Sequence, residues 1–165
     1  MNFKNLILLN RYRFFSSKTQ NKLFPQKFNI IYDSSCYLCN KEIEYLKEKN
    51  TNNIFLFTDL ENKKERYNPN DVKNVGITYE DAMRRMHIVK NDSTIITGKD
   101  AFYEIYKSIG MGKFLYFTQL PIIGDLSNRV YNFWAKYRTS ITRGENIENI
   151  INRYESSCNY KNCKI

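Results

Sequence analysis

Two cysteines separated by two residues are the part of this chain best suited to chemistry. Cys36 and Cys39 lie in the stretch IIYDSSCYLCNKEIEYLKEK, where an apolar run gives way to a helix-like pattern. The free N–H groups and the dipole at a helix start stabilise negative charge, so the first thiol can be a thiolate near neutral pH. One helical turn brings the second thiol within disulfide reach. We therefore expect an exposed Cys36 to attack a substrate disulfide and a more buried Cys39 to resolve the mixed disulfide.

A structural zinc site is the main chemical alternative. Such a site needs four Cys or His ligands, usually as two close pairs. The chain has a second pair, Cys158 and Cys163, and a single histidine, His87. Because the second pair lies in a polar tail, a redox pair is favoured over zinc, over an iron–sulfur cluster and over two inert packed thiols. No metal or cofactor is expected, and the tail pair is interpreted as two exposed thiols near a chain end.

Three further residues could support the dithiol. Asp33 could cap the helix, form a turn or accept a proton from Cys39, and capping is the commonest use of Asp at such a position. Ser35 could cap the same free N–H groups. His87 lies on a predicted strand and is interpreted first as a packed structural histidine. It could still reach the thiols if its strand borders Cys36.

Apolar periodicity predicts the elements that position the dithiol. Residues 27–32 and 54–58 are short apolar runs rich in β-branched and aromatic residues, which predicts two buried strands on either side of the helix that starts at Cys36. A βαβ unit of this kind has parallel strands and a right-handed crossover. Residues 85–90 and 93–97 predict a β-hairpin, and a helix over residues 100–109 follows.

The order β-α-β, then β-β-α, predicts an α/β, thioredoxin-like fold: a small mixed sheet flanked by helices. Further helical segments are expected over residues 60–67, 114–120, 123–138 and 145–154. Pro121 separates the segment 114–120 from the segment 123–138. Aromatic residues fall at helical spacings in and around these segments, and we expect them to pack in the core: Tyr103, Tyr106, Tyr116, Phe117, Tyr131, Phe133 and Trp134.

Composition and charge narrow the function further. Of the 165 residues, 42% are hydrophobic, which is enough apolar material for a single-domain core. The net charge of the chain is +9. Residues 1–27 hold six of the 26 basic residues and none of the 17 acidic ones, so the remainder is only mildly basic. No concentrated basic face is evident, and we expect no nucleic-acid partner. No apolar run is long enough for a transmembrane helix.

The N-terminal residues 1–26 have the composition of a mitochondrial presequence. They are basic, lack Asp and Glu, and mix Leu, Ile and Phe with Ser. The order Arg13-Phe14-Phe15-Ser16 is similar to a matrix processing site. A secretory signal or a plain disordered tail are the alternatives, and import into the mitochondrion, with the matrix as its destination, is favoured.

With these elements in place, the chain resembles the DCC family of thiol-disulfide oxidoreductases, which is named for the Asp and the two Cys of a D-G-x-C-x-x-C pattern. The resemblance covers roughly residues 28–143 and is carried by these matches: Asp33 to Cys39, Phe57-Thr58-Asp59, Met86 to Val89, Thr97 to Phe102, Leu120-Pro121, Tyr131, Trp134-Ala135 and Tyr137-Arg138. Ser34 replaces the family's Gly, and the predicted strand at His87 lacks the cis-proline that thioredoxins proper place beside their disulfide.

These observations support two hypotheses of different classes. The first is a mitochondrial thiol-disulfide oxidoreductase that uses Cys36 and Cys39 on protein or small-molecule thiols and disulfides. The second is a non-catalytic thioredoxin-like subunit or assembly factor of a mitochondrial complex. In either case we expect a presequence or tail over residues 1–26, a thioredoxin-like domain over 27–143 and a C-terminal helix and tail over 144–165.

Overall fold

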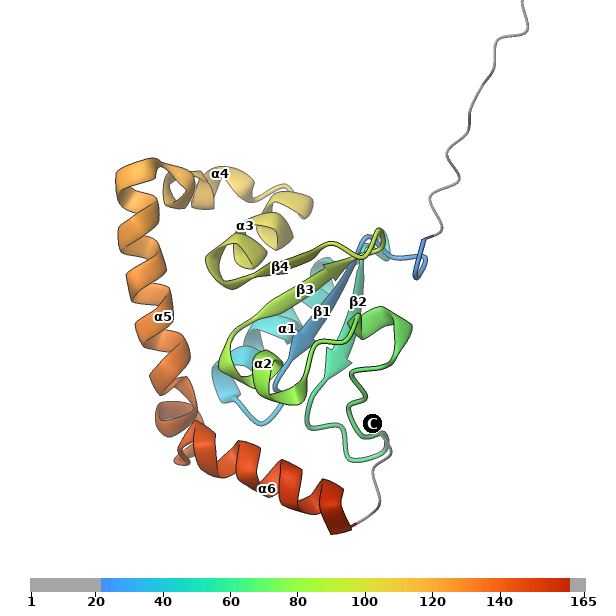
Figure 1. Cartoon of the computed structure of the whole chain (residues 1–165). Coiled ribbons are helices and arrows are strands. Elements are labelled where there is room, and N and C mark those ends of the chain that lie inside the picture. The colour runs from blue at the N-terminus through green and yellow to red at the C-terminus, as the bar shows by residue number, and fades with distance from the viewer. Residues whose placement is uncertain (1–21, 161–165) are drawn as a thin grey trace, which may run out of the picture.

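A four-stranded mixed sheet forms the centre of the protein (Figure 1). The computed structural model describes residues 22–160, so most of the predicted presequence lies outside the described residues. Strands β1 (Phe28–Tyr32) and β2 (Phe55–Asp59) are parallel, whereas β3 (His87–Lys90) is antiparallel to both β1 and β4 (Ile95–Thr97). The strand order β2-β1-β3-β4 confirms the predicted thioredoxin-like arrangement, with extra helices at the C-terminal end.

Alternation of side chains along β1 creates two separate hydrophobic clusters. Ile30 packs on one face of the sheet against α1 (Tyr37–Lys49) and α3 (Gly98–Ser108). Ile31 packs on the other face, against α2 (Tyr79–Arg84) and α6 (Ile147–Tyr160). Helix α6 therefore contributes directly to the core. Residues 22–26 also join it, since Phe24 is buried and the Leu23 N–H donates to the Asn91 carbonyl at 2.9 Å.

The structure contradicts the predicted helix over residues 60–67. This segment is an irregular loop in which the Asp59 carboxylate accepts the Glu61 N–H and the Asn62 side chain accepts the Lys64 N–H. Asp and Asn side chains that bond the backbone two residues ahead compete with helix formation. After η1 (Val72–Asn74), the chain forms α2, which was not predicted, and the Thr78 hydroxyl caps it by accepting the Asp81 N–H at 3.0 Å.

Three helical elements connect α3 to α6: α4 (Gly112–Leu115), the 3₁₀ helix η2 (Tyr116–Gln119) and α5 (Pro121–Arg143). Helix α5 runs along one side of the molecule and leads to α6 (Figure 1). None of the described helices is long and apolar enough to cross a membrane.

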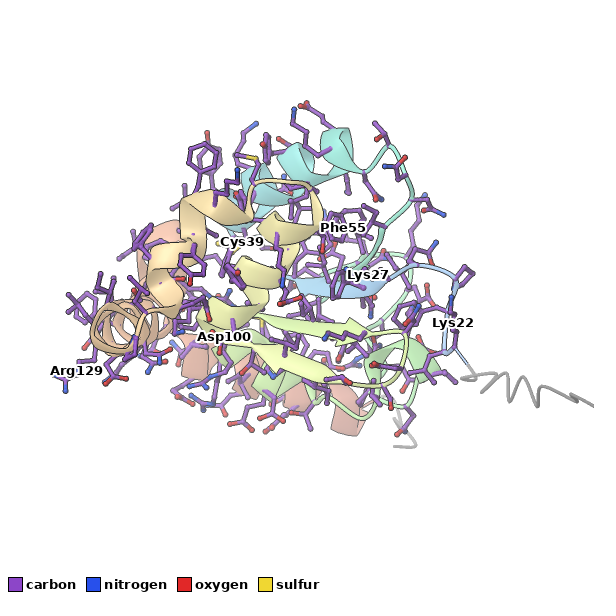
Figure 2. The ribbon with its side chains drawn as sticks, turned by 90° about the horizontal axis from the view of Figure 1, so that it is seen from above. Lys22, Lys27, Cys39, Phe55, Asp100 and Arg129 are labelled. Carbon is purple, nitrogen blue, oxygen red and sulfur yellow. The ribbon has the colours of Figure 1, made fainter. Side chains whose placement is uncertain are left out.

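The outer side of α5 carries large apolar residues, and three of the seven aromatic residues predicted to pack in the core are exposed, whereas Tyr106 packs against the core and Tyr103, Tyr131 and Trp134 are half-buried. Phe133 is 67% exposed, and Tyr116 and Phe117 of η2 are exposed as well. Exposed residues recur along α5 at intervals of three and four: Leu126, Val130, Phe133, Tyr137 and Ile141. We call this set the outer face of α5. Figure 2 shows Arg129, from the same helix, directed away from the sheet.

A pair of truncations distinguishes the core from this outer face. We expect Ile30→Ala to lower the free energy of unfolding by about 2–5 kcal/mol, because Ile30 is fully buried at the centre of the sheet. Phe133→Ala should change it by no more than about 0.5 kcal/mol, because Phe133 is mostly exposed. Urea unfolding of both variants measures the difference, and equal losses would contradict the described exposure of α5.

Candidate functional site

Cys36 and Cys39 lie at the N-terminal end of α1. Cys36 is itself the N-cap residue, and its Sγ accepts a hydrogen bond from the Cys39 backbone N–H at 3.3 Å. This arrangement contradicts the prediction that Asp33 or Ser35 caps the helix. Both cysteines are free thiols in this structure. The sulfur therefore occupies the position at which a helix start stabilises an anion.

The burial of the two thiols is the reverse of what the sequence predicts. Cys36 has no exposed surface, whereas Cys39 is partly exposed. The Thr142 side chain, far along the chain at the end of α5, lies next to the Cys36 thiol, and its hydroxyl donates to the Arg138 carbonyl at 2.7 Å. In Figure 2, Cys39 lies toward α5, whereas Lys22 and Lys27 lie at the opposite end of the sheet.

The surroundings of Cys36 favour its anionic form. Hydrogen bonds from the Cys39 thiol, the Thr142 hydroxyl and the Cys39 N–H, together with the Arg138 charge, outweigh burial and lower the pKa of Cys36 to about 6. The pKa of Cys39 is raised, first because its thiol donates to Cys36 and then because it is partly buried. Near neutral pH, Cys36 is therefore the thiolate and Cys39 the proton donor.

Arg138 is the cation nearest to this dithiol. It is only 8% exposed, its Nη1 lies 3.7 Å from the Cys39 sulfur, and its Nη2 donates to the Met83 carbonyl at 2.6 Å. Among residues 22–160 it forms no ion pair with a carboxylate, and its Nε has no hydrogen-bond partner. A buried cation is stable only with a compensating negative charge nearby. The dithiol is the group that can supply it, because the Arg138 charge favours the anionic form of Cys36.

A second guanidinium fixes the loop in front of Cys36. Nη1 of Arg143, the last residue of α5, lies 3.1 Å from both carboxylate oxygens of the fully buried Asp33 side chain. The same nitrogen lies 3.4 Å from the Glu61 carboxylate, which also accepts a hydrogen bond from the Tyr79 hydroxyl. Asp33 is thus an ion-pair partner and a turn former, because its side chain also accepts the Ser35 N–H at 3.0 Å.

The other residues named from the sequence lie as follows. Ser35 is exposed, and its N–H is held by Asp33. Ser34, which replaces the family's Gly, does not have a positive φ, so the substitution causes no strain of that kind. His87 is buried with Nδ1 2.9 Å from the Arg85 carbonyl, and burial lowers its pKa.

The structure does not bring His87 to the thiols. Cys39 and Met86 line one cavity, whereas His87 lines a different one with Arg85 and Lys136. A supporting role for His87 therefore stays a prediction.

Within residues 22–160, no group of three or more His, Cys, Asp or Glu side chains could hold a metal ion. The second cysteine pair falls outside what the structure describes, because Cys163 and the side chain of Cys158 are not placed.

Sequence reasoning missed the contribution of α5 to the site. Arg138 entered only as part of a family resemblance, and Thr142 and Arg143 were not considered. A usable signal exists, since Arg138, Thr139 and Thr142 recur at helical spacing opposite the outer face of α5. Polar residues at helical spacing are normally assigned to solvent, whereas Arg138 and Thr139 are buried in the last turns of α5.

Comparisons with known proteins agree with this site. The sequence profile of the DCC1-like thiol-disulfide oxidoreductase family matches residues 30–144, a range that includes both cysteines and the three α5 residues that contact them and Asp33. An uncharacterised chloroplastic protein of Arabidopsis thaliana is 33% identical over 156 residues, which cover 90% of this chain and 71% of the relative. No solved structure matches the chain.

Two substitutions on α5 test what lowers the pKa of Cys36. Thr142→Val keeps the shape of the side chain and removes its hydrogen bond, and Arg138→Met removes the buried charge. Both changes should raise the pKa of Cys36. Thr142→Val should raise it by roughly one unit or more, because a hydrogen bond to a charged group contributes about 1.5–3 kcal/mol, and Arg138→Met should raise it by less, because Arg138 acts on Cys36 through its charge alone. The pH dependence of thiolate absorbance measures the pKa directly. Val130→Ala on the outer face of α5 is the control, and variants that keep a pKa of about 6 would contradict the assignment.

Proposed function

The chain belongs to the DCC1-like thiol-disulfide oxidoreductase family, and on that premise we propose that it catalyses thiol–disulfide exchange with Cys36 as the nucleophile and Cys39 as the resolving thiol. One observation carries the proposal: the Cys36 sulfur caps a helix, and the Cys39 sulfur of the same dithiol lies 3.7 Å from a buried guanidinium that has no carboxylate partner among the described residues. An inert pair of packed thiols gives no reason for a buried cation beside them. The proposed substrates are thiols and disulfides of proteins or small molecules.

The proposed reaction proceeds in two exchange steps. The Cys36 thiolate attacks one sulfur of the substrate disulfide, forming a mixed disulfide and releasing the other substrate sulfur as a thiolate that takes a proton from solvent. Cys39 then loses its proton and attacks the Cys36 sulfur. The second substrate thiol leaves, the Cys36–Cys39 disulfide forms, and two electrons have passed to the substrate. The reverse sequence oxidises a substrate dithiol.

Cys36 must become accessible for the first step. Because it has no exposed surface and the Thr142 side chain lies against it, the proposal includes a rotation of the Thr142 side chain away from the thiol. The backbone at the end of α5 stays in place in this step, because the neighbouring Arg143 is held by its ion pair with Asp33.

The stabilised Cys36 thiolate also favours electron flow from the substrate to the Cys36–Cys39 disulfide. Stabilising the reduced dithiol makes its disulfide a stronger oxidant, as in other oxidoreductases with a low-pKa cysteine. At neutral pH, each unit removed from the pKa of Cys36 raises the potential by up to about 30 mV. The pair is therefore expected to accept electrons more readily than a pair with two ordinary thiols.

Alkylation under a graded series of glutathione buffers, read by mass spectrometry, tests the proposed function. We expect reversible linkage of Cys36 to Cys39, rapid alkylation of Cys36 in the reduced protein, and loss of catalysed disulfide reduction in Cys36→Ser. Cys39→Ser should retain the first step and accumulate the mixed disulfide. If Cys36 stays unmodified in every buffer and is never linked to Cys39, the enzymatic proposal fails.

A non-catalytic role remains a second candidate because of one specific observation. The outer face of α5 exposes five large apolar side chains, and exposed apolar patches often mark protein interaction sites. A structural subunit or assembly factor of a mitochondrial complex would use such a face. Co-migration of the native protein with a large mitochondrial assembly, together with an unreactive Cys36, would favour this role over catalysis.

We also propose import into the mitochondrion, on the composition of residues 1–26. A fluorescent protein fused behind residues 1–25 should accumulate in mitochondria, and Arg11→Gln together with Arg13→Gln should reduce its import. Because the Arabidopsis relative is named as chloroplastic, plastid markers belong in the same experiment. A diffuse cytosolic signal or a plastid signal would contradict the proposal.

A further inference from the structure

A small apolar cavity lies beside the partly exposed thiol of the site. It has a volume of about 200 Å³. Leu38, Cys39, Met86 and Phe102 of the thioredoxin-like part line it from one side, and Tyr131 and Trp134 of α5 line it from the other. The cavity therefore exists only because α5 packs across the end of α1 that carries the dithiol.

Several polar groups on the cavity wall already have partners within the protein. The Tyr131 oxygen accepts the Met86 N–H at 2.8 Å, and Glu42 accepts the Tyr106 hydroxyl at 2.6 Å. Each terminal nitrogen of Arg138 has a contact within the protein, and its Nε has less than 1 Å² of exposed surface. An ionised ligand group would therefore lose its water there for few available hydrogen bonds.

Volume limits the ligand further. An apolar cavity of about 150 Å³ in another protein binds benzene, whereas pockets for cofactors and drug-sized molecules measure about 300–1,000 Å³. About 200 Å³ therefore accommodates one large side chain and excludes a nucleotide. The exposed side chains of Tyr37 and Leu38, between the two cysteines, extend the apolar surface at this end of α1.

We propose that this cavity receives an aromatic or large aliphatic side chain next to the reacting cysteine of a peptide or protein substrate. The inference rests on the proposed thiol–disulfide exchange, since it is the mixed disulfide with the dithiol that holds such a substrate beside the cavity. It assigns the substrate class: proteins or peptides with an apolar neighbour at the cysteine, in preference to glutathione disulfide, whose residues offer no large apolar side chain.

Rates of exchange with a matched peptide series test the preference. The substrates are disulfides of short peptides that differ only in the residue before cysteine, which is Phe, Leu, Gly or Asp. The full chain should react with the Phe and Leu peptides roughly tenfold faster or more than with the Gly peptide, because burial of such a side chain contributes about 1.5–3 kcal/mol. The Asp peptide should be no faster than the Gly peptide.

Two variants of the protein test whether the preference for Phe and Leu peptides arises from the cavity. Ala135 lines the cavity and is 6% exposed, so Ala135→Leu should fill part of the space and reduce the ratio of the Phe rate to the Gly rate. Leu126→Ala, on the outer face of α5, should keep that ratio. Thermal unfolding of each variant establishes that it is folded.

Trp134 gives a second measurement that needs no catalysis. It is the only tryptophan in the chain and lines the cavity, so its fluorescence reports occupancy. Titration of the full-length Cys36→Ser variant with S-methylated Phe-Cys and Gly-Cys peptides should change the emission with the Phe peptide alone. This measurement also decides the matter if Ala135→Leu does not fold.

The outcomes separate the two proposals. Equal rates for all peptides, or a fastest rate with the Asp peptide, would overturn the apolar subsite and leave the exchange activity standing. If no disulfide reacts, the proposed function fails and the titration alone decides whether the cavity binds apolar side chains. A change in Trp134 emission with the Phe peptide alone would support the site, and no change or an equal change with both peptides would overturn it.

Discussion

The ion pair between Arg143 and Asp33 is the constraint on which the site depends. It joins the last residue of α5 to the residue that follows β1, and both side chains are almost fully buried. Removing one partner of such a pair typically costs about 3–5 kcal/mol, because the other charge is left uncompensated. This large penalty keeps the end of α5 against the loop that leads to Cys36. The thiol contacts of Thr142 and Arg138 and the wall of the apolar cavity all follow from that placement.

The dithiol combines a local and a remote device. The local one, a sulfur at a helix N-terminus, is encoded by seven consecutive residues from Asp33 to Cys39. The remote one is a hydroxyl and a guanidinium supplied from α5, about a hundred residues later. Each lowers the pKa of Cys36, whose sulfur is fully buried in this structure. The ionisation of Cys36 therefore depends on a helix that is far from it in the sequence.

Much of the fold could be predicted from the sequence because its signals are local. Two apolar runs around a Cys-x-x-Cys helix and one hairpin determine the sheet, and the structure confirms this sheet. Residues 60–67 were predicted to be a helix because charged residues are common both in exposed helices and in loops. The loop forms because the side chains of Asp59 and Asn62 accept backbone N–H groups two residues ahead. Helix α5 was oriented wrongly for a deeper reason. Large apolar side chains line its exposed side as well as its buried side, and the last turns of the buried side carry Arg138, Thr139 and Thr142, so amphipathicity, which normally identifies the core-facing side, does not identify it here.

The positions of Arg143 and α6 also limit how small a separable part of this protein can be. A fragment ending with α4 would keep all four strands and the Cys36–Cys39 pair. It would lack both guanidiniums, leave the Asp33 carboxylate without its cation and open the cavity wall formed by α5. A stable fragment of this chain therefore has to extend through Arg143 and into the core-forming part of α6, well past the point at which the thioredoxin-like topology is complete.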